Sequence, residues 1–208
     1  GEVGPCFTFD GTENGGPVTT GTAPLLDLGD GCTFSFWARA DADCAISYLF
    51  EGFTAASGYQ LGAIWWENGI EFYPENVSAK DIRGDGASAF LDTVRTYTHL
   101  NLPDTSWHHY AYTFDGTRLG VYHDGASQTN AAINLCFGSG QPGRVNQMFY
   151  IGRRHPGLNR YFKGGMDEFR VERACRSADW VKACYDNQRG GLCAVGPVAK
   201  RGAVLSLR

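Results

Sequence analysis

The sequence predicts an all-β protein built as a sandwich or jelly roll, and three observations favour this fold class. Short runs of alternating apolar and polar residues, typical of strands with one buried face, recur along the chain. Asp-Gly and Asn-Gly steps, which supply the positive φ of tight hairpin turns, separate many of these runs. No helical patterns alternate with the strands, as a parallel α/β sheet would require.

The clearest pattern is SWHHYAYTFDGTRLGVYHDG at residues 106–125. It predicts strands over 108–114 and 118–123, each followed by an Asp-Gly turn. His108 and His109 are adjacent, so they face opposite sides of their strand and cannot both bind one metal ion. His123 and His155 have no Cys or His neighbour at the spacing of a zinc site, so the sequence does not predict zinc.

The remaining secondary structure follows from the same rules. One helix is expected at residues 177–188, because Ser177 is a good N-cap and Asp179 lies in the first turn, where the helix dipole favours a negative charge. Gly190 and Gly191 end this helix. Further strands are expected at residues 6–9, 33–40, 47–53, 59–66, 69–73, 89–98, 128–134, 148–152 and 165–172.

Composition limits the classes of partner. The chain has 208 residues with a formal net charge of -4, which provides no general attraction for nucleic acid. No apolar run reaches the roughly 18 residues of a membrane span, so membrane insertion is not expected. Residues 1–193 are expected to form one domain, and the basic tail at 194–208 is either a linker or a last edge strand.

Seven cysteines are many for a cytosolic domain, and none forms a Cys-x-x-Cys pair. We therefore expect an oxidising compartment and about two or three disulfides. The odd number leaves at least one free thiol, which we assign to Cys32. Its position in the alternating pattern places it on the same face as Phe34 and Phe36.

Several segments occur together in the order of one known family: FTFDGTENG, CTFSFWARAD, the 106–125 segment, FYIGRR, FKGGMDEFRV and RSADWVKACYDNQ. Over about residues 6–188 the chain resembles a laminin G-like domain of the concanavalin A-like lectin/glucanase superfamily, in its bacterial secreted form. The resemblance implies a concanavalin A-like jelly roll of two antiparallel sheets, one concave, with one short C-terminal helix. It also implies an extracellular or cell-surface location and, as in many members, one calcium ion.

The resemblance also implies where calcium would bind. It places the first and last strands side by side, so Asp10, Asn14 and Asp167 are the expected calcium ligands. The alternative is that Asp10 only sets a turn and Asp167 only accepts backbone hydrogen bonds. The same adjacency suggests one neighbourhood for Cys6, Cys175, Cys184 and Cys193, which leaves Cys44 and Cys136 as a long-range pair.

Glycan binding usually requires aromatic faces and planar polar groups. Two consecutive tryptophans on a strand cannot both face the core, and a loop near residue 155 carries three arginines. The expected ligand-binding residues are Trp37, Trp65, Trp66, Arg153, Arg154 and Arg160. The alternative is that loops cover the tryptophans and that the arginines pair with surface carboxylates.

The sequence therefore predicts a secreted or surface recognition module that is not an enzyme and binds a glycan or surface polysaccharide. A structural or adhesive domain of a larger surface protein, binding another surface protein, is the alternative. A polysaccharide-degrading enzyme is disfavoured, because the Glu-x-Asp-x-x-Glu motif of glucanases with this fold is absent. The consecutive Asp167 and Glu168 are expected to face opposite sides of their strand.

Overall fold

The computed structural model describes most of the chain, and every structural statement below concerns the residues that it describes. These are residues 5–19, 26–27, 31–54, 59–66, 69–75, 100–101, 105–115, 119–128, 144–145, 148–154, 159–189, 193–195 and 205–207. The expected strands at 89–98 and 128–134 lie outside them, except for Gln128.

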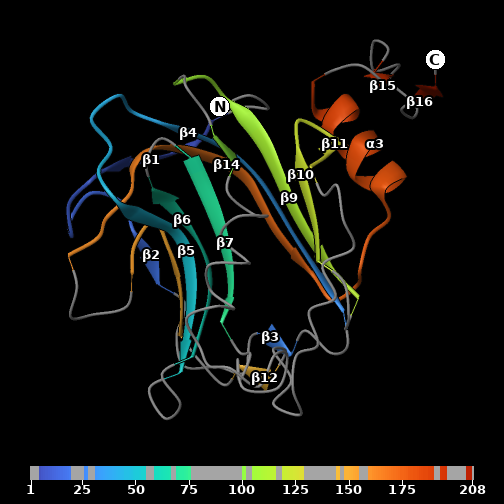
Figure 1. The fold of residues 1–208 in the computed structure, drawn as a ribbon. Helices are drawn as coiled ribbons and strands as arrows, with labels where there is room; N and C mark the ends of the chain where they lie inside the picture. The colour runs from blue at the N-terminus through green and yellow to red at the C-terminus, as the bar shows by residue number, and fades with distance from the viewer. Residues whose placement is uncertain are drawn as a thin grey trace, which may run out of the picture.

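Two six-stranded antiparallel sheets face each other (Figure 1). The first sheet has the order β1 (Phe7–Asp10), β14 (Lys163–Glu172), β4 (Cys32–Ala40), β9 (His108–Phe114), β10 (Leu119–His123) and β11 (Ala126–Ser127). The second has the order β2 (Val18–Thr19), β13 (Met148–Ile151), β5 (Ser47–Thr54), β6 (Tyr59–Trp66), β7 (Gly69–Glu75) and β8 (Leu100–Asn101). The predicted jelly-roll class is confirmed.

Two small pairings complete the sheet structure. β3 (Leu26–Asp27) pairs with β12 (Arg144–Val145). In the basic tail, β15 (Cys193–Val195) pairs with β16 (Leu205–Leu207) as a separate two-stranded sheet. The two-residue strands β2, β3, β8, β11 and β12 were not expected, because a pattern of two residues carries no periodicity.

The core lies between the two six-stranded sheets. Phe34 on β4 stacks on Phe50 on β5, with ring centroids 5.1 Å apart. Phe36 reaches the same ring edge-on at 5.7 Å. Cys32 is buried in this cluster, as the alternation predicted. The aromatic side chains thus join the two sheets through apolar contact.

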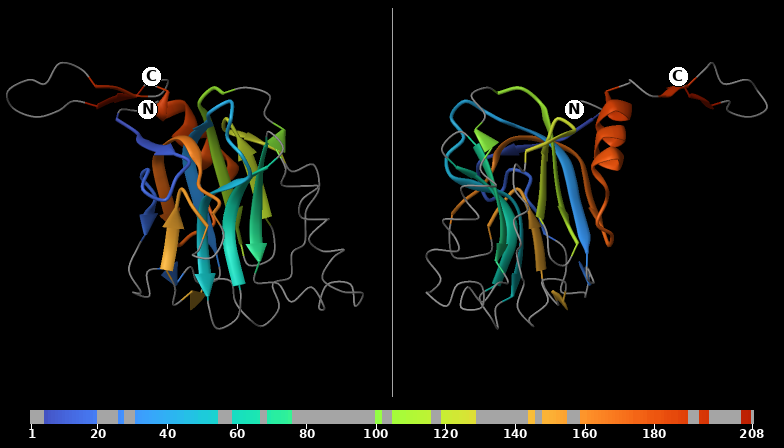
Figure 2. Two further views of the ribbon diagram at one scale, coloured as in Figure 1. Left: turned by 90° about the vertical axis from the view of Figure 1, so that its left-hand side faces the viewer. Right: turned by 45° about the vertical axis from the view of Figure 1, so that its right-hand side comes forward.

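The predicted helix is present as α3 (Ala178–Gln188). The Oγ atom of Ser177 accepts a hydrogen bond of 3.2 Å from the amide of Trp180, and Asp179 lies in the first turn. Val181 is fully buried against Ala111 and Tyr122. Helix α3 therefore covers the outer face of the first sheet, so strands there are buried on both sides (Figures 1 and 2).

The meander forms as predicted in its described residues, 106–115 and 119–125. β9 pairs antiparallel with β10, with His123 opposite Tyr110. Asp124 and Gly125, at φ 50° and 74°, turn the chain into β11. Among the residues that the structure describes, no helix has the length and hydropathy needed to cross a membrane.

Candidate functional site

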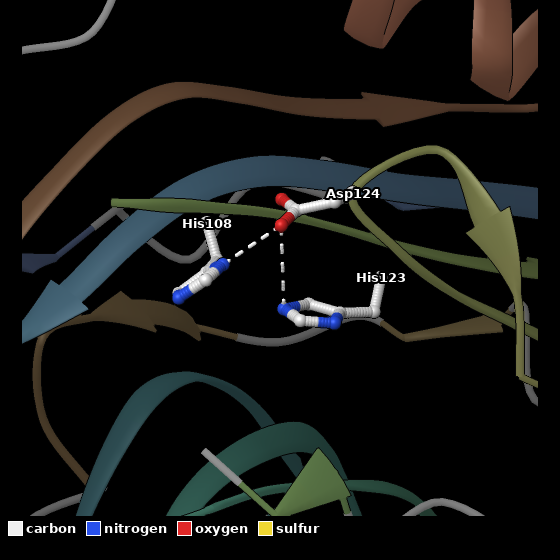
Figure 3. Close-up of side chains that lie close together, drawn as sticks. All are labelled: His108, His123 and Asp124. Atoms are coloured by element: carbon white, nitrogen blue, oxygen red, sulfur yellow. Dashed lines mark hydrogen bonds and ion pairs between the residues drawn. The ribbon is translucent and has the colours of Figure 1, made fainter. Parts of the chain in front are cut away.

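His108, His123 and Asp124 form a compact group at one end of the first sheet (Figure 3). His108 begins β9, His123 ends β10, and Asp124 follows in the turn. The Nδ1 atom of His108 lies 2.8 Å from Oδ2 of Asp124, and Nε2 of His123 lies 3.7 Å from the same oxygen. One candidate ligand atom from each residue lies within 4.8 Å of the others, a spacing at which they could hold a metal ion.

The two imidazoles share the core-facing side of the sheet. Tyr110 and Val121, which lie two positions away along β9 and β10, belong to the core, and side chains alternate along a strand. His123 stacks on Tyr110, with centroids 5.5 Å apart, and its ring centroid is 4.7 Å from that of His108. Sequence spacing could not reveal this neighbour of His123, because His108 comes from the adjacent strand and not from nearby sequence.

The turn holds the carboxylate of Asp124 in place. Its Oδ1 atom accepts a 2.9 Å hydrogen bond from the amide of His109, and its own amide donates to the carbonyl of His109 at 2.8 Å. Burial acts to raise the pKa of Asp124, but the hydrogen bonds from His108 and the His109 amide outweigh burial. The pKa therefore lies below its usual value, and the group is a carboxylate at neutral pH.

His109 faces the opposite side of β9, as predicted. It is buried beneath α3, with its ring centroid 5.5 Å from that of Trp37 and 5.9 Å from that of Tyr185. Burial lowers its pKa from 6.5 to about 4, and Arg170 adds to the effect while Asp124 opposes it. His109 is therefore a neutral packing residue.

A second group of polar side chains lies on the outward side of the second sheet, and we call it the arginine–tyrosine cluster. It consists of Tyr48, Glu51, Tyr150, Arg153, Arg154 and Tyr161. Tyr150 pairs with Glu51 between β13 and β5. Their neighbours Phe149 and Phe50 point into the core, so Tyr150 and Glu51 point away from it.

Arginine side chains lie over the tyrosine rings of this cluster. Arg154 is 5.3 Å from the ring centroid of Tyr48, and its Nε atom is 3.7 Å from Oε1 of the fully buried Glu51. Arg153 is 5.8 Å from the ring centroid of Tyr150 and 5.1 Å from that of Tyr161. These distances are typical of cation–π contacts.

Two of the three predicted arginines, Arg153 and Arg154, belong to this cluster, and Arg160 is joined to it through the backbone. The amide of Arg154 donates a 3.1 Å hydrogen bond to the carbonyl of Arg160, which joins the two arms of the loop. Nη1 of Arg153 is also 3.7 Å from a carboxylate oxygen of the exposed Glu13. The tyrosines were not expected here, because they come from separate strands and only the sheet register brings them together.

The predicted tryptophans do not share this surface. Trp37 faces outward from the first sheet, as its position predicts, but α3 covers it and leaves 2% of it exposed. Trp65 lies in the core, with 7% exposed. Neither ring has an open face for a sugar. Trp66 ends β6, and its side chain lies outside the described part of the structure.

Asp10 and Asp167 lie far apart along the pair of neighbouring strands. β1 does pair with β14, as expected, but Asp10 is opposite Lys163. Asp167 is four residues further along β14, which corresponds to about 13 Å of strand. The ligands of one calcium ion lie about 2.3–2.6 Å from the metal. The structure therefore does not bring Asp10 and Asp167 to one ion.

Each carboxylate instead has a local role. Oδ1 of Asp10 accepts a 2.8 Å hydrogen bond from the amide of Thr12, and Asn14 is exposed in the same turn. Oδ1 of the buried Asp167 accepts a 2.9 Å hydrogen bond from the amide of Glu168, at a β-bulge where Glu168 has φ 51°. These are the turn and backbone roles that the sequence left open as the alternative.

The cysteines that the structure describes with their side chains carry free thiols: Cys6, Cys32, Cys44, Cys175 and Cys184. Burial, with a smaller effect of Cys175, raises the pKa of Cys32 to about 12, so this thiol stays protonated. Cys136 lies outside the described residues, and so does the side chain of Cys193. The expected disulfides remain predictions.

Two facing antiparallel sheets with one helix on the outside define a lectin-like jelly-roll domain. The family model of the concanavalin A-like lectin/glucanases superfamily, of the laminin G type, matches residues 10–182. The chain belongs to this family. No curated protein sequence matches the chain.

Solved structures of the same fold include enzymes and binding proteins. Domain 4 of AbnA, an extracellular arabinanase of Geobacillus stearothermophilus solved with arabinotriose, is 16% identical with a TM-score of 0.59, over 88% of this chain and 77% of that one. A sialidase of Trypanosoma rangeli is 14% identical with a TM-score of 0.59, over 89% of this chain. A heptameric SAP-like pentraxin of Limulus polyphemus is 12% identical with a TM-score of 0.55, over 96% and 93%.

The chain spans 27% of the sialidase chain, so it corresponds to one part of that enzyme. At 12–16% identity these likenesses show the shared fold alone. Function must therefore be argued from the residues of this chain.

Proposed function

We propose that this domain is a non-catalytic carbohydrate-binding module that acts outside the cell or at its surface. The observation that carries the proposal is the arginine–tyrosine cluster on the outward side of the second sheet. Guanidinium groups supply several planar donors for hydroxyl or carboxylate oxygens, and aromatic rings provide apolar faces for sugars. Tyr48 and Tyr150 are buried, with 6% and 2% exposed, so they hold the arginines in place, and within the cluster the half-buried Tyr161 is the ring that remains for a sugar.

The charge of the cluster favours an acidic glycan. Arg153 lies near Glu13 and Arg154 near Glu51, and Arg160 adds a third positive charge next to them along the loop, so three arginines meet two carboxylates. Arginine binds carboxylate and sulfate groups through paired hydrogen bonds. Structures of similar fold include an arabinanase domain solved with arabinotriose and one part of a sialidase that was solved with sialic acid.

The absence of catalysis is part of the proposal. Glycoside hydrolysis usually uses two carboxylates about 5–10 Å apart in an accessible site. Glu51 is fully buried beside Arg154, and Asp167 is buried on the first sheet. Neither carboxylate is placed where it can reach a bound sugar.

Calcium is not part of the proposed binding mode. The resemblance implies an ion at Asp10, Asn14 and Asp167, but the register of β1 and β14 separates the two carboxylates. The extracellular location is supported by the number of cysteines. Protease treatment of intact source cells, followed by detection of the released domain, tests that location.

A structural or adhesive role in a larger surface protein is the second candidate. The observation that favours it is the β15–β16 hairpin, which extends away from the sandwich in both views of Figure 2. A hairpin in this position could connect the domain to a neighbouring one. Pull-down with other surface proteins of the source, with and without residues 193–208, would test this role.

Glycan-array binding tests the main proposal. We expect the folded chain to bind acidic glycans, and Arg153→Met to weaken binding at least about tenfold, because methionine keeps the packing on the tyrosines but removes the charge. Lys182→Met is the matched control, since Lys182 is an exposed cation paired with Asp186 on α3. A folded wild-type chain that binds no glycan, or Arg153→Met binding that equals wild type, would overturn the proposal.

A further inference from the structure

We propose that His108, His123 and Asp124 form a zinc site. This site lies on the first sheet and is separate from the arginine–tyrosine cluster on the second sheet. The inference goes beyond carbohydrate binding and does not depend on it.

The separations of the ligand atoms suit zinc. Zn²⁺ binds imidazole nitrogen at about 2.0–2.1 Å and carboxylate oxygen at about 2.0–2.2 Å, so two ligands of a tetrahedral site lie about 3.4 Å apart. The observed separations from Oδ2 of Asp124 are 2.8 Å to His108 and 3.7 Å to His123. The two imidazole ligand atoms lie within 4.8 Å of each other, so side-chain shifts of up to about 1.4 Å would bring all three pairs to the required distance.

The backbone positions these three ligand residues before any metal ion binds. His108 and His123 lie on paired strands, and Asp124 occupies a two-residue turn with φ 50°. The amide of His109 binds Oδ1 of Asp124, which leaves Oδ2 directed at both imidazoles (Figure 3). Hydrogen bonds of this kind orient the ligands of protein metal sites and strengthen metal binding.

Zinc binding would require only that one proton of His108 move from Nδ1 to Nε2. Without metal, Nδ1 of His108 donates a proton to Oδ2 of Asp124 in a hydrogen bond of 2.8 Å. Zinc would replace this proton between the two atoms, and the neutral imidazole would carry its proton on Nε2 instead. No group needs to be oxidised or reduced.

The donor set selects zinc over calcium. Two nitrogens and one oxygen suit a borderline transition-metal ion, whereas calcium prefers six to eight oxygens. The side chains of His108, His123 and Asp124 are 18%, 23% and 31% exposed, whereas Nε2 of His123 is itself buried, so the site lies just beneath the surface. Three protein ligands leave a fourth position for water or for an oxygen of a ligand.

Titration of the metal-free chain with ZnCl₂, followed by calorimetry, tests the site. We expect one equivalent to bind, with no competition from CaCl₂. Asp124→Asn is the most informative variant, because asparagine tolerates positive φ and keeps an oxygen for the His109 amide. We expect Asp124→Asn and His123→Gln each to weaken zinc binding at least about tenfold, and Asp43→Asn, a control at an exposed carboxylate outside the group, to bind as wild type does.

Cysteine thiolates also bind zinc, so a spectroscopic measurement must separate the two kinds of ligand. We expect the Co²⁺-loaded chain to show the absorption of nitrogen and oxygen ligation without thiolate charge-transfer bands. We also expect zinc to shift the imidazole NMR signals of His108 and His123 in the wild-type chain, a result that needs no variant. Absence of binding, thiolate bands, or affinity unchanged in Asp124→Asn and His123→Gln would overturn the proposal.

Discussion

The indole nitrogen of Trp37 on β4 donates a hydrogen bond of 2.6 Å to Oε1 of Gln188, the last residue of α3. The same tryptophan stacks on Tyr185, with ring centroids 5.6 Å apart. These contacts stabilise the packing of α3 against the outer face of the first sheet. They also explain why the outward-facing tryptophan of β4 is unavailable to a ligand.

Gln188→Ala should lower the free energy of unfolding by about 1–3 kcal/mol, because it leaves a buried indole N–H without its partner. Trp37→Ala should cost about 3–5 kcal/mol through lost packing. Urea denaturation measures both, with Asn187→Ala, an exposed neighbour, as the control. Equal stability of Gln188→Ala and Asn187→Ala would contradict the role of this hydrogen bond.

His109 should make stability depend on pH. Its folded pKa of about 4 lies below the ordinary 6.5, so between these values the unfolded chain binds more protons than the folded one. Stability should therefore be complete above about pH 6.5 and fall as the pH drops to 4, by about 3 kcal/mol. Urea denaturation between pH 4 and pH 6.5 measures this fall in stability. His109→Gln should flatten the dependence of stability on pH.

In the turn at Asp124-Gly125, Asp124→Asn should change stability little, whereas Gly125→Ala should lower it. Gly125 has φ 74°, and a Cβ atom there would lie 2.9 Å from Cδ1 of Tyr185. Gly125→Ala should therefore cost about 1–2 kcal/mol from the backbone, plus the effect of the displaced helix. Asp124→Asn should change the melting temperature much less. A Gly125→Ala chain as stable as wild type would show that α3 does not pack here.

Cys32 should resist alkylation in the folded chain. Its thiol is buried and its pKa is raised to about 12, so almost no thiolate is present at neutral pH. Cys175 is exposed and should react in the same experiment. Mass spectrometry after iodoacetamide treatment, with and without urea, distinguishes the two. Labelling of Cys32 at the rate of Cys175 before unfolding would contradict the described packing.

Calcium should not stabilise the domain through Asp10 and Asp167. The two residues lie four strand positions apart, about 13 Å along the paired strands, too far for their carboxylates to share an ion. Melting curves of the metal-free chain should coincide with CaCl₂ and with MgCl₂ at the same ionic strength. A calcium-specific rise in melting temperature that is lost in both Asp10→Asn and Asp167→Asn would restore the expected site.

Much of the fold could be predicted because its signals are local. A few neighbouring residues are enough to predict three features: the alternation in β4 and β9, the Asp-Gly turn at Asp124, and the N-cap at Ser177. The candidate sites were less predictable. The loop arginines were identified from sequence, but Tyr48 and Tyr150 join them only through the pairing of β5 and β13 with the adjoining loop.

The sequence by itself determined the two-sheet class, the meander, the helix and the buried Cys32, because side-chain period and turn chemistry are local properties. Only the tertiary structure decided which outward-facing residues stay accessible. Helix α3 covers Trp37, and the register separates Asp10 from Asp167. Register also places His123 beside His108, because neighbours across a sheet are set by strand pairing and not by distance along the chain.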